Sequence, residues 1–194
     1  MSRFLRVATF VGLVALTGCG GSSSSPPRNL DNACSIVDQR PKYLRAMKKT
    51  ERKWGVPVHV QMATIYQESK FDGDARTPYR FLLGVIPMGR QSSAFGYAQA
   101  LDGTWDEYRS STGNRGADRD DIADATDFMG WYMNNTTDRL GISKRDARNQ
   151  YLAYHEGQTG YARGSYKSKG WLIDVANSVA ARANTYEQQL RRCR

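Results

Sequence analysis

Apolar residues recur at helical spacing along much of this chain, and the pattern is most regular near the C-terminus. Steps of four and three residues alternate there through Leu172, Ala176, Val179, Ala183, Tyr186, Leu190 and Cys193. This stripe puts all of them on one side of a helix, and that side must pack against a core. The spacing predicts a helix over 171–192 with Cys193 on its core-facing side.

The rest of the chain also favours helices. Residues 35–54 predict one or two amphipathic helices interrupted at Pro41. Residues 57–69 predict another helix, opened by a proline at a first helical position. Ser143 with Asp146 three residues later is a capping-box pattern that opens a further helix. That helix is expected over 143–155, and two others are expected over 104–111 and 120–140.

Residues 72–103 break this pattern. They hold seven glycines and prolines, which predict a loop or a short hairpin, and 81–86 is the best candidate for a strand. We therefore expect a mainly α (α+β) domain with one irregular or short β excursion between its helices.

The N-terminus has the features of an export signal. Arg3 and Arg6 precede an apolar run over 7–16, which is far shorter than the roughly 20 residues of a membrane-spanning helix. The run ends in Leu16-Thr17-Gly18-Cys19, which resembles a bacterial lipobox. The resemblance implies a signal peptide over 1–18 and lipid modification of Cys19. The alternative is a plain secretory signal with an unrelated cysteine.

The residues after Cys19 resemble a tether. Residues 20–27 are a low-complexity stretch of Gly, Ser and Pro with no means of packing, so we expect 19–33 to be the lipidated cysteine and a flexible tether and 34–194 to be the folded domain. By resemblance to enterobacterial lipoproteins, Gly20 after the cysteine favours the outer membrane. We expect a monomer in the periplasm of a Gram-negative bacterium, anchored to the inner leaflet of the outer membrane through Cys19.

Two further cysteines, Cys34 and Cys193, lie at the two ends of the globular part. An even number of cysteines in an exported chain suggests a disulfide between them. The alternative is two separate buried thiols.

The charge balance suits an anionic partner. The chain carries 28 Lys and Arg against 19 Asp and Glu, a formal charge of +9. Nucleic acid, lipid headgroups and an acidic wall polymer all fit this charge, but an exported chain rarely meets nucleic acid, so we expect none. His59 and His155 are not at metal-ligand spacing, and no nucleotide-binding motif occurs, so we expect no metal and no cofactor.

Three short motifs follow one another in the body of the chain: Glu68-Ser69-Lys70-Phe71, Gly96-Tyr97-Ala98-Gln99 and Tyr154-His155-Glu156-Gly157. In this order they resemble the soluble lytic transglycosylase domain of the lysozyme-like superfamily, glycoside hydrolase family 23. That family has Glu-Ser-x-Phe, Gly-Leu-Met-Gln and Ala-Tyr-Asn-x-Gly. The resemblance covers about 55–165 and departs from the pattern at Tyr97-Ala98 and at His155.

The resemblance implies a lysozyme-like fold and cleavage of the β-1,4 bond between N-acetylmuramic acid and N-acetylglucosamine in peptidoglycan. The product would carry 1,6-anhydro-N-acetylmuramic acid. One alternative is a hydrolytic muramidase of the goose-lysozyme type, and another is a non-catalytic wall-binding lipoprotein. From Ala75 to Leu101 there is no Asp or Glu, which favours the lyase over a hydrolase that needs assisting aspartates in this region.

Glu68 is the candidate general acid. A helical wheel places it at the edge of an apolar face, where partial desolvation raises a carboxyl pKa. Cleavage of a glycosidic bond near neutral pH needs such a protonated acid. The alternative is a solvated glutamate near a helix end.

The family pattern also implies roles for other motif residues. Tyr154 would reach the acid or the substrate near it, and the alternative is a core tyrosine. Gln99 and Ser69 are candidate substrate contacts, each with a structural hydrogen bond as its alternative. Glu156 is expected in the variable position of its motif and not as a second catalytic carboxylate. The other candidate substrate contacts are Gly96, Tyr97, through sugar stacking, and His155, which also suits a structural role.

Overall fold

The computed structural model describes residues 25–83 and 85–193. The predicted signal peptide and Cys19 lie outside the described residues. Within them the chain is mainly helical, as expected, with one two-stranded antiparallel sheet. The elements are α1 (Ala33–Gln39), α2 (Pro41–Trp54), α3 (Val58–Ser69), β1 (Tyr79–Leu82), β2 (Ile86–Arg90), α4 (Asp102–Thr112), α5 (Ile122–Leu140), α6 (Ala147–Glu156), α7 (Gln158–Ala162), the 3₁₀ turn η1 (Ser165–Ser168) and α8 (Gly170–Leu190).

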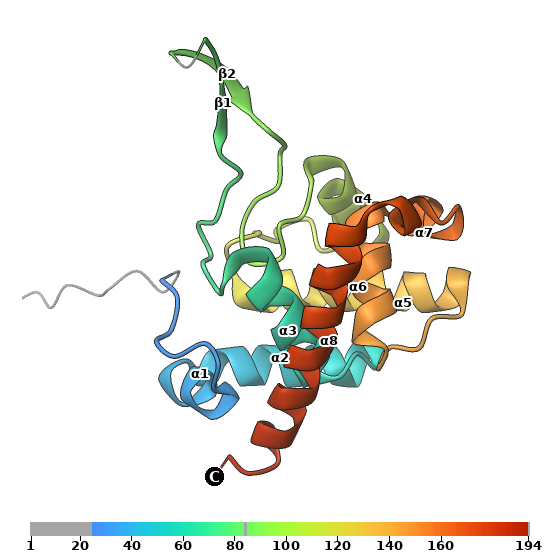
Figure 1. Cartoon of the computed structure of the whole chain (residues 1–194). Helices are drawn as coiled ribbons and strands as arrows, with labels where there is room; N and C mark the ends of the chain where they lie inside the picture. The colour runs from blue at the N-terminus through green and yellow to red at the C-terminus, as the bar shows by residue number, and fades with distance from the viewer. Residues whose placement is uncertain (1–24, 84, 194) are drawn as a thin grey trace, which may run out of the picture.

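Helix α3 lies at the centre of the domain. Its residues Val60, Met62, Ala63 and Ile65 are fully buried, and even the polar Gln61 and Thr64 have no exposed surface. A helix buried on nearly all sides must be enclosed by others. Helix α8 packs along α3 and α6, while α2 packs on α5 (Figure 1). The last residues of α3 therefore lie in the interior of the domain.

The predicted stripe on the C-terminal helix is confirmed. Leu172, Ala176, Val179, Ala183 and Tyr186 are buried along α8. The chain ends are joined, because Cys34 in α1 and Cys193 just after α8 form the predicted disulfide. The amide of Ala33 also donates to Gln189 Oε1 at 2.7 Å.

Two local predictions were wrong. The short hairpin predicted as one alternative for this region is present, but 81–86 is not one strand, because the chain turns at Leu83, whose φ is +52°, and the hairpin β1–β2 forms around this turn. Ser143 does not open the helix that follows it. Asp146 caps α6 instead, and its carboxylate accepts from the amide of Asn149 at 3.0 Å. A charged acceptor at the first free amides also interacts favourably with the helix dipole.

The hairpin β1–β2 projects from the helical body (Figure 1). All five residues of β2 are exposed, so neither face of this small sheet is covered by a helix. None of the helices in 25–83 or 85–193 has the length and apolar character needed to cross a membrane.

Candidate active site

Glu68 lies in the last turn of α3, facing α6. It keeps partial contact with solvent, yet desolvation by the surrounding protein is the largest influence on it and raises its pKa to about 7. A hydrogen bond from the Tyr151 hydroxyl and the positive charge of Lys70 both lower the pKa and so oppose this effect. The balance keeps a substantial fraction of the carboxyl protonated at neutral pH, which is the state a general acid needs.

Tyr151 is the tyrosine that contacts Glu68. It is on α6 with only 4 % of its surface exposed, and its hydroxyl hydrogen-bonds the Glu68 carboxyl. The motif points instead to Tyr154, one turn later on the same helix, as the residue that reaches the acid or the substrate near it; its pKa is raised by burial and also by the charge of Glu68. The spacing of three residues puts both rings on one face of α6, so the signal for Tyr151 was present in the sequence.

The backbone turns sharply just after Glu68. Lys70 and Phe71 both have left-handed conformations, with φ of +54° and +62°. Each such residue costs about 1–3 kcal/mol and persists only where the surroundings determine it. The Phe71 ring is fully buried and stacks on Tyr43 with centroids 5.9 Å apart. Burial of Phe71, the last residue of the first motif, therefore holds the strained turn in place.

Three consecutive carbonyls of the second motif join all three motifs. The Gly96 carbonyl accepts from Gln99 Nε2 at 2.9 Å, and the Tyr97 carbonyl accepts from Ser69 Oγ at 2.9 Å. The Ala98 carbonyl accepts from the Tyr154 hydroxyl at 2.7 Å. Each motif thus supplies one side chain to the same short stretch of backbone. These bonds set the position of the 96–99 loop relative to α3 and α6.

Gly96 is required at its position by the backbone. Its φ is +77°, and a Cβ there would lie 2.1 Å from the carbonyl oxygen of Arg119. The neighbouring amide of Tyr97 donates to this same oxygen at 3.2 Å. The glycine therefore allows the loop to approach the segment before α5.

Two predicted substrate contacts need correction. The Tyr97 ring is 1 % exposed, and its hydroxyl hydrogen-bonds the Tyr43 hydroxyl at 3.0 Å, so it cannot stack on a sugar. Ser69 is buried, and its hydroxyl is directed to the Tyr97 carbonyl, which is its structural alternative. Both residues had been assigned from the motif alone, which does not show which side of the loop faces the substrate.

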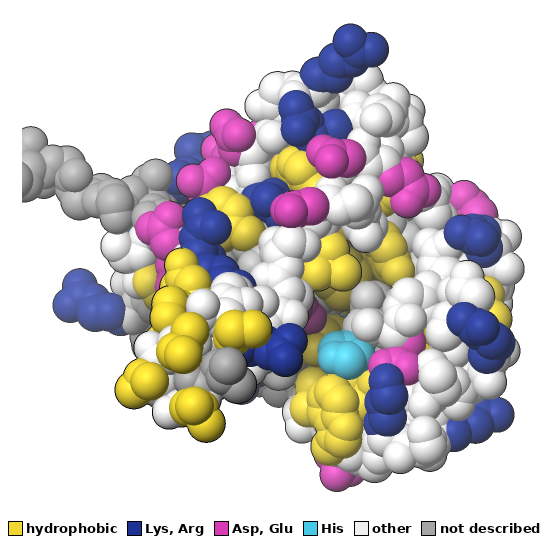
Figure 2. Space-filling view, turned by 90° about the horizontal axis from the view of Figure 1, so that it is seen from above, with side chains coloured by type: hydrophobic (Ala, Val, Ile, Leu, Met, Phe, Trp, Pro, Cys, Tyr) yellow, Lys and Arg dark blue, Asp and Glu magenta, His cyan; other side chains and the backbone are white. Residues whose placement is uncertain are grey.

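Gln99, Tyr154 and His155 line a cavity of about 240 Å³ next to the motif loop. The exposed His155 ring packs edge-on against Trp171, with centroids 5.3 Å apart. Trp171 is itself largely exposed, which makes it a candidate sugar-stacking residue that the sequence analysis missed. Figure 2 shows this face hollowed, with a histidine at the margin of the hollow.

Glu156 is held apart from this chemistry. Its carboxylate binds Lys169 Nζ at 2.7 Å and the Ser165 hydroxyl, and these bonds lower its pKa to about 2. His155 Nδ1 lies 3.2 Å from the same carboxylate. Through these bonds Glu156, the last residue of α6, holds the segment between α6 and α8 in position.

A mainly helical domain with a raised-pKa carboxyl, joined through one loop to two further motifs, has the architecture of the lysozyme-like class. The family model of the transglycosylase SLT domain matches residues 7–193. The chain therefore belongs to this family, whose members are transglycosylase-type enzymes acting on peptidoglycan. A search of curated proteins finds no match.

Proposed function

We propose that the chain is a membrane-bound lytic transglycosylase of the glycoside hydrolase family 23 type. It would cleave the β-1,4 bond between N-acetylmuramic acid and N-acetylglucosamine and leave 1,6-anhydro-N-acetylmuramic acid. The observation that carries the proposal is Glu68, a carboxyl at the end of α3 whose burial raises its pKa to about 7.

A single carboxyl must act twice in this reaction. Protonated Glu68 first gives its proton to the glycosidic oxygen, and the N-acetyl group of the muramic acid stabilises the positive charge that develops at C1. Glu68, now a carboxylate, then takes the proton of the C6 hydroxyl as this oxygen attacks C1 of the same sugar. The attack is intramolecular, so its high effective concentration favours it over attack by water.

Glu156 does not suit the role of a second catalytic base. A base works best when its pKa is near the working pH, and the bonds from Lys169 and Ser165 hold Glu156 far below it. Together with the absence of Asp and Glu from Ala75 to Leu101, this favours the lyase over the goose-type hydrolase, which must activate a water molecule.

The membrane location is proposed from the sequence. The lipobox-like Leu16-Thr17-Gly18-Cys19 supports acylation of Cys19, and Gly20 supports the inner leaflet of the outer membrane. Two or more acyl chains anchor a protein stably where one does not. Metabolic labelling with a fatty acid in the native host should mark the wild type but not Cys19→Ala, and an unlabelled wild type would refute the anchor.

The product distinguishes the candidate functions. We would digest purified sacculi with the full chain and identify the soluble glycans by mass spectrometry. Anhydro ends, lighter than reducing ends by one water, are expected. Reducing muramic acid ends would establish the hydrolase instead, and no soluble product would indicate a binding protein.

A matched pair of variants assigns the acid. Glu68→Gln removes one proton at nearly constant shape and should lower the rate by about 100-fold or more. Glu156→Gln serves as the control on the only other motif carboxylate. If Glu156→Gln abolishes turnover while Glu68→Gln does not, the assignment of the acid is wrong.

A further inference from the structure

The hairpin β1–β2 gathers most of the exposed apolar surface of the domain. Six of the eight large hydrophobic residues that are exposed in the described parts of the chain belong to it. They are Tyr79 (51 % exposed), Phe81 (54 %), Leu83 (85 %), Val85 (75 %), Ile86 (50 %) and Met88 (61 %). Contiguous apolar surface of this kind marks a binding site for a partner or a membrane.

The charge of the same segment is purely positive. From Ala75 to Leu101 the only charged residues are Arg76, Arg80 and Arg90, and all three are exposed. None of them takes part in a salt bridge of the described structure. Their charge is therefore available to an anionic surface.

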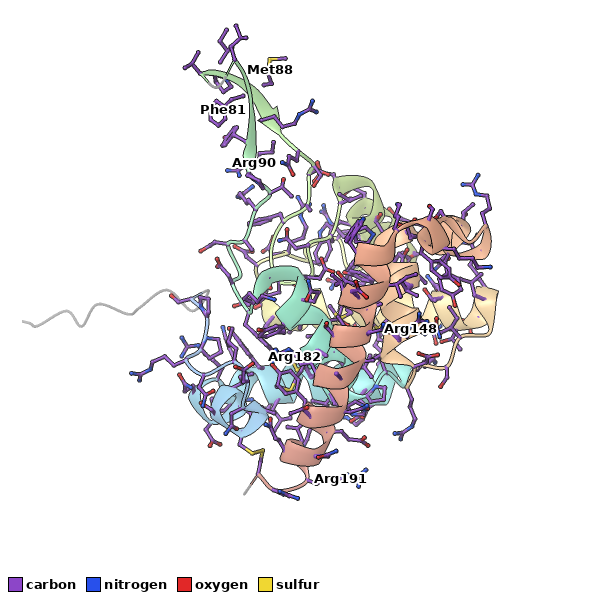
Figure 3. The ribbon with its side chains drawn as sticks, in the orientation of Figure 1. Phe81, Met88, Arg90, Arg148, Arg182 and Arg191 are labelled. Carbon is purple, nitrogen blue, oxygen red and sulfur yellow. A yellow bond between two sulfur atoms is a disulfide. The ribbon has the colours of Figure 1, made fainter. Side chains whose placement is uncertain are left out.

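The residues are layered along the hairpin. Leu83 and Val85 flank the turn, while Tyr79 and Arg90 pair across the strands near the body. The Arg90 guanidinium lies 4.4 Å from the centre of the Tyr79 ring and donates to the Thr77 carbonyl at 2.6 Å. Figure 3 shows Phe81 and Met88 on the outer part of the hairpin, beyond Arg90. An aliphatic tip above a layer of Tyr and Arg matches the order of a bilayer interface, from acyl chains to headgroups.

Other occupants fit this layering less well. A glycan strand needs hydrogen-bonding groups and flat aromatic faces, whereas the most exposed residues, Leu83 and Val85 beside the turn, are aliphatic. A second copy of the chain would bring the same three arginines to the interface, and like charges disfavour such pairing. An anionic bilayer satisfies both the apolar tip and the arginines.

We propose that the tip of the β1–β2 hairpin inserts into the headgroup and upper acyl region of an anionic lipid bilayer. The contact is separate from any anchor at Cys19 and from the Glu68 site. It would fix the orientation of the domain on the membrane, which a flexible tether cannot do.

Site-specific fluorescence tests the contact in the full chain. In a Cys19→Ala background, Cys34 and Cys193 are bonded to each other, so an environment-sensitive dye can be attached at Leu83→Cys alone. The protein is bound to vesicles of phosphatidylethanolamine with phosphatidylglycerol. We expect a blue-shifted emission that is quenched by lipids carrying a quencher on the upper acyl chain.

The matched control carries the dye at Ser110→Cys, an exposed position on α4, where no shift is expected. An unshifted dye at position 83 in vesicle-bound protein would overturn the proposal. Equal quenching in purely zwitterionic phosphatidylcholine vesicles would overturn its anionic part.

A second set of variants separates insertion from other contacts. Val85→Asp with Ile86→Asp, both at exposed positions, should abolish the shift of the dye at position 83, whereas Ser110→Asp should retain it. The emission of the dye at position 83 does not depend on the N-terminal segment, because it reports only the surroundings of the hairpin tip. Concentration-dependent dimers that are lost in the double Asp variant would instead show pairing with a second copy and overturn the proposal. Lower activity of this variant on detergent-purified sacculi would also overturn it, by showing that the hairpin binds glycan.

Discussion

Glu68 is subject to opposing influences that connect catalysis to stability. Burial raises its pKa from the usual 4.5 to about 7, so the folded protein holds this proton more tightly than the unfolded chain does. Stability therefore falls as the pH rises from about 4.5 to about 7 and stays lower above that range. A carboxyl that serves as an acid near neutral pH is thus kept at a cost in stability.

Replacing Glu68 by Gln should remove this cost. At pH 8 the free energy of unfolding of Glu68→Gln should exceed that of the wild type by up to about 3 kcal/mol more than it does at pH 4.5. Urea titrations at the two pH values measure the difference. Glu107→Gln, which removes an exposed carboxylate of α4, is the matched control. A pH-independent difference would mean that Glu68 is not buried in the way described.

Tyr151 should tune the pH dependence of the reaction. The rate constant kcat/KM requires protonated Glu68, so it should fall as the pH rises through about 7. The Tyr151 hydrogen bond lowers the pKa of Glu68, so Tyr151→Phe should move this fall to higher pH. Tyr154→Phe, which loses the bond to the Ala98 carbonyl, should lower the rate without moving the fall. Identical pH profiles for wild type and Tyr151→Phe would contradict the assignment.

The sequence could predict the acid at this scale but not its partner. Glu68 was found because a motif and a helical wheel agreed on it. The motif also singled out Tyr154, whereas the hydroxyl that reaches Glu68 is that of Tyr151. Both tyrosines share a face of α6, and only the packing of α6 on α3 decides which ring meets the carboxyl.

The same distinction holds for whole elements. Long periodic segments were predictable, because the stripe on α8 needs only local spacing. For 72–103 the sequence predicted a loop or a short hairpin, but it placed the strand at 81–86, across the turn. The strand bounds were not predictable, because the apolar residues of the hairpin are exposed and carry no alternation of buried and exposed positions. The short α7 and η1 were not anticipated, because segments of four or five residues hold too few apolar positions to define a period.

The loop of the second motif should be intolerant of any side chain at Gly96. A Cβ would collide with the Arg119 carbonyl, and φ of +77° is unfavourable for any other residue. Gly96→Ala should lower the free energy of unfolding by about 2–4 kcal/mol and the activity with it. Gly103→Ala is the control, since nothing lies within 4 Å of its Cβ position and alanine favours the helix. Thermal unfolding that is equal for Gly96→Ala and Gly103→Ala would contradict the described loop geometry.

At the scale of the whole molecule, the site depends on segments far apart in the sequence. Residues 68–71, 96–99 and 151–156 come together because α3 is central and both α6 and α8 pack on it. The disulfide lies at the other end of α8 and links it to α1. The contacts that hold the chain ends together are therefore separate from the contacts that form the site.

Reduction of the Cys34–Cys193 disulfide should consequently lower stability but spare activity. The bond closes nearly the whole folded chain, and in the chain-entropy model such a loop contributes at most about 5 kcal/mol. The bonds of Gln189 to Ala33 and Asp31 still hold α1 near α8 after reduction, so the site should survive well below the melting temperature. Thermal unfolding and sacculus digestion with and without reductant measure the two effects, with Cys34→Ser/Cys193→Ser as the control that reductant should not change. An unchanged melting temperature after complete reduction, verified by alkylation of both thiols, would show that the disulfide does not stabilise the domain. Loss of activity at a temperature where the reduced protein remains folded would show that the chain ends and the site are coupled after all.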